Sequence, residues 1–175
     1  TRTLTIAGSF LFSALLSQSA FATTISANAS SGSDATGDGS VGNPYQSFHQ
    51  AYSNAASGDT LLLSGVFDWT NASETGDATI TGYSLLKNLT IIGDGSGATF
   101  IQAASSAGTA DRCVFTINAD INFEDLTIRY GFNTNQAENS GGITVMDDVR
   151  DNIVTMDQCV IEENGIDNGT TSNYN

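Results

Sequence analysis

Apolar residues along most of the chain occur in short alternating runs that are separated by Gly, Asn, Asp and Ser. Four runs share a form, because each ends in Gly or Asn; they are Asp59–Gly65, Asn88–Gly93, Asp125–Gly131 and Gln158–Asn164. Alternation of apolar and polar residues over a short run indicates a β-strand with one buried face. The turn residues between the runs indicate short connections. The pattern therefore predicts many short strands joined by turns.

The runs recur along the chain at a loose period. Intervals of 28, 37 and 33 residues separate Leu61, Leu89, Leu126 and Cys159. A second repeat pairs Phe115 and Ile117 with Ile143 and Val145, again 28 residues apart. Such a period, with insertions at the turns, is typical of a solenoid whose coils stack strand on strand. We expect an all-β fold, a right-handed parallel β-helix. Its interior should contain one row formed by Leu61, Leu89, Leu126 and Cys159. An outward row should consist of Thr60, Thr90, Thr127 and Val160.

One segment has helical spacing instead. Phe48, Ala51, Tyr52 and Ala55 are three and four residues apart, which predicts a short amphipathic helix over Ser47–Ala56. Ser47 and Gln50 stand at the first and fourth positions of a capping box, in which each side chain bonds a free backbone N–H. We expect this helix to cover the open first coil and to block edge-to-edge association of strands.

The first 22 residues have the pattern of a signal peptide. Arg2 precedes an apolar stretch over Leu4–Leu16, and Ala20-Phe21-Ala22 forms a small-x-small cleavage site. We expect cleavage after Ala22, and hence a secreted or cell-surface protein. Residues 23–46 are polar and rich in Gly, which predicts a loop or extended segment ahead of the helix. Residues 47–175 then form the cap and first coils of the β-helix, which we expect to be truncated at the C-terminus because Asn173–Asn175 reads as a polar loop.

The net charge is −14, and removal of residues 1–22 with Arg2 leaves four basic against nineteen acidic residues, a net charge of −15. Such a chain repels nucleic acid and anionic lipid, so neither is expected as a partner. No later segment approaches the roughly 20 apolar residues of a membrane-spanning helix. Cys113 and Cys159 each alternate with apolar neighbours, which predicts two buried free thiols, although export permits a disulfide.

The segment from Gly37 to Phe67, with its Gly-Asp-Gly-Ser, Asn-Pro-Tyr and Gly-Asp-Thr-Leu-Leu-Leu-Ser-Gly-Val-Phe sequences, resembles the N-terminal region of secreted bacterial right-handed β-helix proteins of the pectate-lyase-like fold. Gly141-Gly142-Ile143 followed by Ile161-Glu162-Glu163-Asn164 resembles one repeat of the polymorphic outer-membrane proteins. The second resemblance implies an adhesin at the cell outer membrane.

The pectate-lyase-like fold also carries polysaccharide lyases and hydrolases, so an enzymatic function depends on which catalytic residues the chain contains. Glu124, Asp125, Arg129 and Tyr130 form the best local cluster for a ligand surface, with a surface ion pair of Arg129 as the alternative. His49, the single histidine, lies on the predicted helix and is expected to face solvent. Asp34 and Asp38, in a Gly-rich loop, are candidate calcium ligands, with a plain turn as the alternative. No other cofactor is expected.

Two functions remain open from the sequence. The first is a secreted or cell-surface scaffold for adhesion or carbohydrate binding, whose ligand is an extracellular polysaccharide or a surface molecule. The alternative is a polysaccharide lyase or hydrolase whose catalytic coils lie beyond residue 175. The four basic residues of the processed chain do not share a repeat position, so no convergent catalytic set is predicted within it.

Overall fold

The computed structural model of the chain describes residues 21–74, 82–109, 111–134, 141–146, 151–167 and 172–174. The predicted signal peptide falls almost entirely outside these residues. The elements, in chain order, are β1 (Thr24–Asn28), α1 (Phe48–Asn54), β2 (Thr60–Ser64), β3 (Val66–Asp68), β4 (Tyr83–Leu85), β5 (Leu89–Ile92), β6 (Phe100–Gln102), β7 (Phe115–Ile117), β8 (Ile121–Glu124), β9 (Thr127–Arg129), β10 (Phe132–Asn133), β11 (Ile143–Val145), β12 (Val154–Asp157), β13 (Val160–Glu162), β14 (Gly165–Asp167) and β15 (Ser172–Tyr174).

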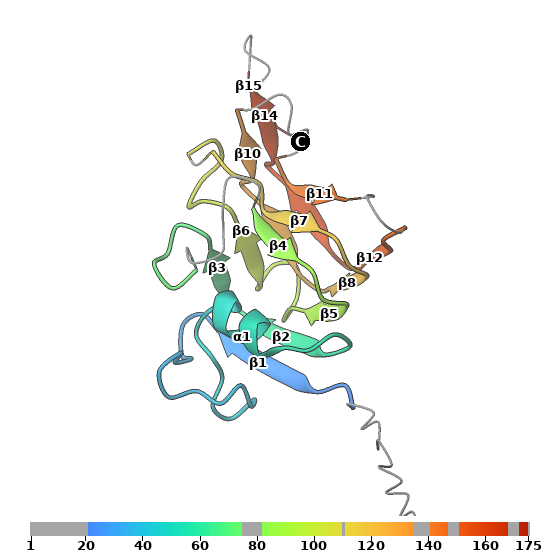
Figure 1. The fold of residues 1–175 in the computed structure, drawn as a ribbon. Helices are drawn as coiled ribbons and strands as arrows, with labels where there is room; N and C mark the ends of the chain where they lie inside the picture. The colour runs from blue at the N-terminus through green and yellow to red at the C-terminus, as the bar shows by residue number, and fades with distance from the viewer. Residues whose placement is uncertain are drawn as a thin grey trace, which may run out of the picture.

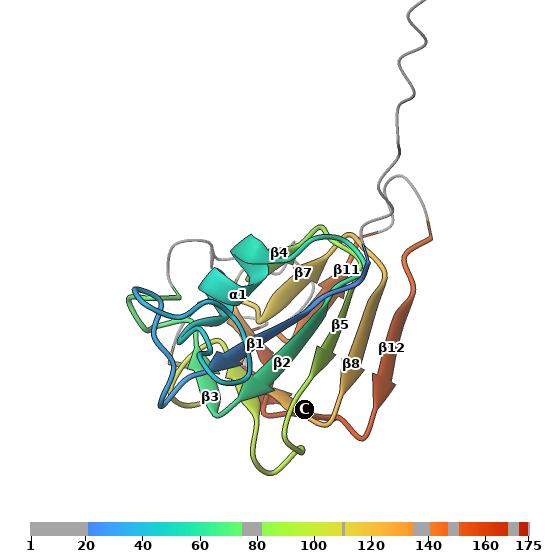
Figure 2. The same ribbon diagram turned by 90° about the horizontal axis from the view of Figure 1, so that it is seen from below.

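The strands build a parallel β-solenoid of about four turns, which confirms the predicted stacking of coils (Figure 1). A five-stranded sheet has the order β1-β2-β5-β8-β12, and a four-stranded sheet has the order β3-β6-β9-β13. A three-stranded parallel sheet has the order β4-β7-β11. Seen from below, the strands of the five-stranded sheet lie side by side (Figure 2). Each later coil passes through the three-stranded, the five-stranded and the four-stranded sheet in turn.

The predicted single inward row is wrong in register. Leu61 lies opposite Ile91, two residues beyond Leu89. Because strand side chains alternate, a shift of two residues keeps the same face inward, so the predicted direction of these side chains holds. Leu126 and Cys159 belong to another side of the coil, since they directly precede β9 and β13 of the four-stranded sheet. The inward row of the five-stranded sheet consists of Ile25, Leu61, Ile91, Phe123 and Met156.

Two of the predicted pairings are confirmed. In the three-stranded sheet, Phe115 lies opposite Ile143 and Ile117 opposite Val145. The outward residues pair as Thr60 with Thr90 and Thr127 with Val160, but in two different sheets. Thr127 is nevertheless buried, and its hydroxyl donates a 2.6 Å hydrogen bond to the carbonyl of Ser96 in the loop between β5 and β6. Outward placement and exposure are therefore separate properties here.

The helix α1 packs its apolar side against the edge strand β4 of the three-stranded sheet. Phe48 is fully buried, and its ring lies 5.0 Å from that of Tyr83 and 5.4 Å from that of Trp69. In chain order, α1 precedes β2 as β4 precedes β5 and as β7 precedes β8. The helix thus stands where the later coils have a strand of the three-stranded sheet.

Polar groups far apart in sequence fix both ends of α1. The Ser47 hydroxyl accepts a hydrogen bond from the Gln50 N–H at 3.0 Å, as predicted. The other half of the predicted capping box is wrong, because the Ser47 N–H donates to the carboxylate of Asp34 at 2.9 Å. The Glu74 carboxylate accepts hydrogen bonds from the N–H groups of Phe48 and His49. At the other end the Lys87 ammonium donates to backbone carbonyls, satisfying acceptors that a helix C-terminus leaves free.

The N-terminal polar segment is more structured than predicted. Its first residues form β1, which pairs in parallel with β2 and so adds a strand to the five-stranded sheet. The rest of the segment is loop, joined to β1 at an isolated bridge between Ala27 and Tyr45. At the other end of the chain, the predicted polar loop contains β15, which pairs antiparallel with β14. No helix among the described residues is long and apolar enough to span a membrane.

Gly141 and Asn164, in the segments that resemble a repeat of the polymorphic outer-membrane proteins, have a structural role. A Cβ atom at Gly141 would lie 2.2 Å from the carbonyl oxygen of Gly165, so only glycine fits between the coils there. The Asn164 side chain is buried, accepts the Gly131 N–H at 2.8 Å and donates to the Ile128 carbonyl at 3.2 Å. These side-chain bonds satisfy backbone groups of the preceding coil, which a turn would otherwise leave buried and unpaired.

Cys113 and Cys159 are free thiols, as predicted. Cys113 is buried, but Cys159 is only half-buried against the core, so the prediction of two buried thiols is wrong for Cys159. Cys159 lies beside β13, an edge strand of the four-stranded sheet, whereas Cys113 lies inside the stack of coils.

Candidate functional site

The cluster predicted from the sequence is divided between two sheets. Glu124 ends β8 on the outer face of the five-stranded sheet, where its carboxylate accepts a hydrogen bond from the Asn122 amide. Asp125 occupies the corner between the sheets with φ 54°, in the left-handed region. Arg129 ends β9 on the outer face of the four-stranded sheet. The carboxylate near Arg129 is that of Glu162, whose Oε1 lies 3.9 Å from Nη1 of Arg129. The surface ion pair that the sequence analysis gave as the alternative is therefore present.

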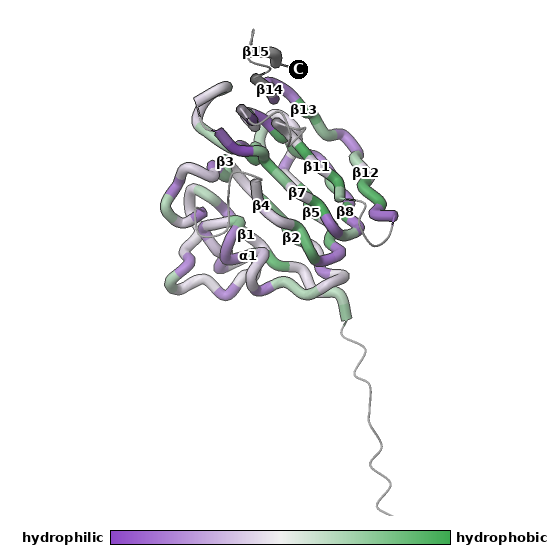
Figure 3. The backbone as a smooth tube through the Cα atoms, turned by 45° about the horizontal axis from the view of Figure 1, so that its top comes forward, coloured by the Kyte–Doolittle hydropathy of each residue, from purple (hydrophilic) through white to green (hydrophobic). Residues whose placement is uncertain are grey.

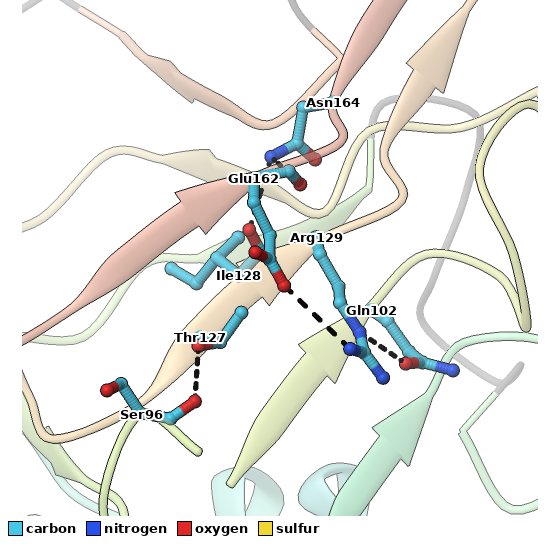
Figure 4. Close-up of polar contacts among 7 residues, drawn as sticks. All are labelled: Ser96, Gln102, Thr127, Ile128, Arg129, Glu162 and Asn164. Carbon is cyan, nitrogen blue, oxygen red and sulfur yellow. Dashed lines mark hydrogen bonds and ion pairs between the residues drawn. The ribbon is translucent and has the colours of Figure 1, made fainter. Parts of the chain in front are cut away.

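Arg129 belongs to a ladder of polar side chains that crosses the four-stranded sheet (Figure 4). Parallel pairing places Asp68, Gln102, Arg129 and Glu162 at one register position. Side chains at matching positions of adjacent strands are one strand spacing apart, about 4.8 Å, and so reach one another. The Gln102 amide donates to Asp68 Oδ2 at 2.9 Å and accepts from Arg129 Nε at 3.0 Å.

The guanidinium of Arg129 is also held by aromatic rings. Its central carbon lies 3.9 Å from the centroid of the Phe100 ring and 4.5 Å from that of Tyr130. Tyr130 has φ 63°, a conformation that bulky residues rarely adopt, and this turns the chain at the end of β9. With Gln102 and Glu162, these rings engage most of the guanidinium, so the ladder stabilises the stacking of coils rather than presenting an open cationic site.

A hollow of about 320 Å³ lies on the outer face of the five-stranded sheet, across β5, β8 and β12. Polar side chains that line it come from successive coils, because Thr90, Asn122 and Thr155 occupy one outward register position. Ile153, which is 63% exposed, adds an apolar surface at the rim. Amide and hydroxyl groups beside an exposed aliphatic side chain can bind a ligand that has both hydroxyl groups and C–H faces.

Turn residues fix the shape of the larger hollow. The Asn88 side chain accepts the Asp120 N–H at 3.0 Å, and the Asp120 carboxylate accepts the Ile153 N–H at 3.0 Å. Each turn is thus bonded to the same turn of the next coil. These bonds hold the lining residues at the spacing of the sheet, so the hollow is formed before any ligand binds.

A second hollow, of about 220 Å³, lies on the same sheet nearer β1. It is enclosed by Leu62 and Ser64 of β2, by Pro44 of the N-terminal polar segment and by Asp94 after β5. Ser26 also lines it, and the buried hydroxyl of Ser26 has no hydrogen-bond partner. Both hollows therefore lie on one face of the molecule, with the strands of the five-stranded sheet between them.

The remaining sequence candidates have structural neighbours. His49 is half-buried rather than solvent-facing, and its Nδ1 lies 3.2 Å from the Tyr83 hydroxyl. Asp34 accepts the N–H groups of Gln46 and Ser47, which places its carboxylate at the start of α1. Asp38 accepts the Ser40 N–H at 2.9 Å, and hydrogen bonds from Ser40 hold the pKa of Asp38 below its usual value. No cluster of three or more His, Cys, Asp or Glu residues suited to a metal ion occurs among the described residues.

Most residues of the polar ladder and of the larger hollow were not identified from the sequence. Asp68 and Gln102 escaped because the short strands β3 and β6 were not recognised as equivalents of β9. Asn122 and Thr155 stand at alternate positions of strands, a signal that was present, but their common register depends on loop lengths that vary between coils. In comparisons with protein-family models, curated protein sequences and solved structures, no match was found.

Proposed function

We propose that this chain is a secreted or cell-surface β-helix scaffold whose five-stranded sheet binds an extracellular polysaccharide. The larger hollow is the observation that carries the proposal, because its lining repeats amide and hydroxyl groups at the spacing of the strands. A polysaccharide is itself a repeat of hydroxyl groups, so a row of donors and acceptors can bind several of its sugar units. Binding to a surface polymer is also what an adhesion scaffold requires.

The charge of the protein favours a neutral polysaccharide. The net charge of −15 on the processed chain, four basic against nineteen acidic residues, repels a polyuronate or a sulfated polymer over the distance of a Debye length. The larger hollow itself is lined in part by the acidic residue Asp120. Since a carboxylate accepts hydrogen bonds from sugar hydroxyl groups, this acidic lining is compatible with a neutral ligand.

The proposal includes the finer features of the fold. The solenoid winds right-handed, as nearly all parallel β crossovers do, and α1 covers its first coil. The position of α1 beside β4 and the burial of Phe48 support the capping role. The scaffold is exported with cleavage after Ala22, and in keeping with the resemblance of its repeat to outer-membrane proteins it acts as an adhesin. An experimental structure tests the handedness, and fractionation of the producing cells tests the location.

The binding proposal is tested with purified protein and a panel of neutral polysaccharides, by affinity gel electrophoresis and calorimetry. Asn122→Ala and Thr155→Ala each remove a hydrogen-bonding group from the larger hollow. Each substitution should weaken binding roughly two- to tenfold, since a hydrogen bond contributes about 0.5–1.5 kcal/mol. Ser84→Ala is the matched control, because Ser84 is exposed on β4 of another sheet.

Two results contradict the proposal. The first is the absence of binding to any neutral polysaccharide by protein that is folded. The second is binding that Ser84→Ala weakens as much as Asn122→Ala does, because the ligand would then lie elsewhere. Stronger binding to polyuronates at low salt than to neutral polymers would contradict the preference for a neutral ligand.

A further inference from the structure

The backbone nitrogen of Thr23 lies 2.7 Å from Oδ1 of Asp59 and donates a hydrogen bond to it. Asp59 is only 4% exposed, and its second oxygen accepts the Ala56 N–H at 2.7 Å. Thr23 itself is exposed and directly precedes β1. A buried carboxylate is thus directed at the backbone nitrogen that follows the predicted cleavage site.

The position of this nitrogen is fixed by the sheet. The Thr60 N–H donates to the Thr23 carbonyl at 2.9 Å, and Thr24 pairs with Thr60 in the parallel ladder of β1 and β2. The Asp59 carbonyl accepts the Thr90 N–H at 3.1 Å, which ties Asp59 to the next coil. Both residues are bonded into the sheet, and the hydrogen bond from Ala56 to the other carboxylate oxygen holds the Asp59 side chain toward the Thr23 nitrogen.

We propose that cleavage between Ala22 and Thr23 converts this nitrogen into an N-terminal ammonium group whose ion pair with Asp59 locks β1 onto the five-stranded sheet. The inference rests on the proposed export of the chain. Before cleavage, the same contact is an ordinary amide–carboxylate hydrogen bond. After cleavage, it joins two opposite charges, so processing of the precursor strengthens the fold.

The chemistry is peptide hydrolysis by an endopeptidase of the export pathway. The bond between the Ala22 carbonyl carbon and the Thr23 nitrogen breaks, and water supplies a hydroxyl to the carbon and a hydrogen to the nitrogen. The resulting amine takes up one more proton from solvent at neutral pH, because an α-amino group has a pKa of about 7.7–8.0. No oxidant, metal or further reactant is required.

The charged groups around the pair favour it. Burial opposes ionisation of Asp59, but hydrogen bonds from Ala56 and Thr23 and the nearby positive charge of Lys87 hold its pKa below the ordinary value. Asp59 is therefore an anion at neutral pH and can accept the second positive charge. The bond from an amide N–H to this carboxylate is already charge-assisted, and an ammonium in place of the amide adds the Coulomb attraction of two opposite charges at short distance.

The test compares three forms of the processed chain in thermal unfolding. One begins at Thr23 with a free amine, one begins at an acetylated Thr23, and one retains Ala22. The free-amine form should unfold roughly 2–4 °C above the other two, as about 1 kcal/mol gives in a chain of this size. In Asp59→Asn the difference should vanish. In the control Asp68→Asn, which changes another buried carboxylate, it should persist.

The measurement also separates this inference from the proposal of export. The three forms are prepared by cleavage of a fusion protein, so the unfolding experiment does not depend on natural processing. The natural N-terminus of the exported protein is found separately by mass spectrometry. A terminus other than Thr23 would refute processing at Ala22 but not the ion pair. Equal unfolding temperatures of all three forms overturn the ion pair. If Asp59→Asn does not fold, the pKa of the α-amine, from its acylation rate against pH, decides: a raised value supports the pair, and an ordinary value overturns it.

Discussion

The two ends of the solenoid differ in how they bury the same inward positions. Near α1, Phe48, Trp69 and Tyr83 are at most 1% exposed. At β12 and β13, the inward residues Met156 and Ile161 are 39% and 48% exposed. Hydrophobic colouring continues from β5 and β8 into β12, although the environment changes (Figure 3). Burial in a solenoid is thus set by the presence of a coil on both sides, not by the residue alone.

Register makes the comparison direct. Phe123 and Met156 occupy one inward row in adjacent strands, yet Phe123 is fully buried. Ile128 and Ile161 stand in the same relation one sheet further along the coil. In the described part of the chain, β11, β12 and β13 are the last strands of their sheets. The pairs therefore separate the contribution of a position from that of its neighbours.

The largest expected effect concerns the inward row. Phe123→Ala should lower the free energy of unfolding by about 3–5 kcal/mol, because it removes a buried ring and leaves a cavity. Met156→Ala should cost less than about 1 kcal/mol, since the side chain is already partly in water. Urea denaturation followed by far-UV circular dichroism measures both. Equal losses for the two substitutions would show that the end at β12 is as well packed as the interior.

The second effect is a pH dependence confined to the end at α1. Burial raises the pKa of Glu74 to about 7, against hydrogen bonds from the N–H groups of His49 and Phe48, and the charge of Asp34 adds to the rise. The folded state therefore binds the proton more tightly than the unfolded chain. Stability from Glu74 is fully present below pH 4.5 and is lost as the pH rises through 7, by about 3 kcal/mol.

Denaturation at several pH values compares the wild type with Glu74→Gln, in which this part of the pH dependence should be missing. Ser84→Ala, which changes an exposed residue of β4 that does not titrate, is the control and should leave the pH dependence unchanged. A wild-type protein that grows more stable relative to Glu74→Gln between pH 5 and pH 8 would contradict the assignment.

The smallest effect compares the two thiols. Cys113 is buried, so it should react with a thiol reagent only after denaturation. Cys159 is half-buried, and burial raises the pKa of its thiol, so it should react in the native protein, though slowly. One thiol per molecule should therefore react in the native protein and two in the denatured protein. Cys159→Ser should abolish the reaction of the native protein. Two equivalents from the native protein would show that the coil containing Cys113 opens readily.

Local patterns allowed α1 and the strands β2, β5, β7, β9, β11 and β13 to be predicted, because alternation and helical spacing are properties of neighbouring residues. The pairing of Phe115 with Ile143 was also predictable, because both residues begin the same local alternation of an apolar residue, Thr and an apolar residue. The alignment of Leu61 with Leu89 failed by two residues because a turn between coils can lengthen without changing which face is inward. The short strands β3 and β6 were missed, and with them the first half of the polar ladder.

The binding face shows the same limit. Thr90, Asn122 and Thr155 are ordinary outward strand residues in the sequence, and only their common register brings them to one hollow. A surface ion pair of Arg129 was weighed from the sequence without a named partner, and its bond to Gln102 requires a strand that was not recognised. Asp34 and Ser47 meet only because the N-terminal polar segment folds back onto α1.

The sequence by itself determined that this chain forms stacked short strands with one amphipathic helix, since periodicity and turn residues act over a few positions. The tertiary structure decided which strands share a sheet, which polar side chains meet, and how deeply Glu74 and Asp59 are buried. Those outcomes depend on contacts between coils about 30 residues apart, such as the 36 residues between Thr23 and Asp59. Register across such distances is fixed by packing and loop length together, which local sequence patterns do not encode.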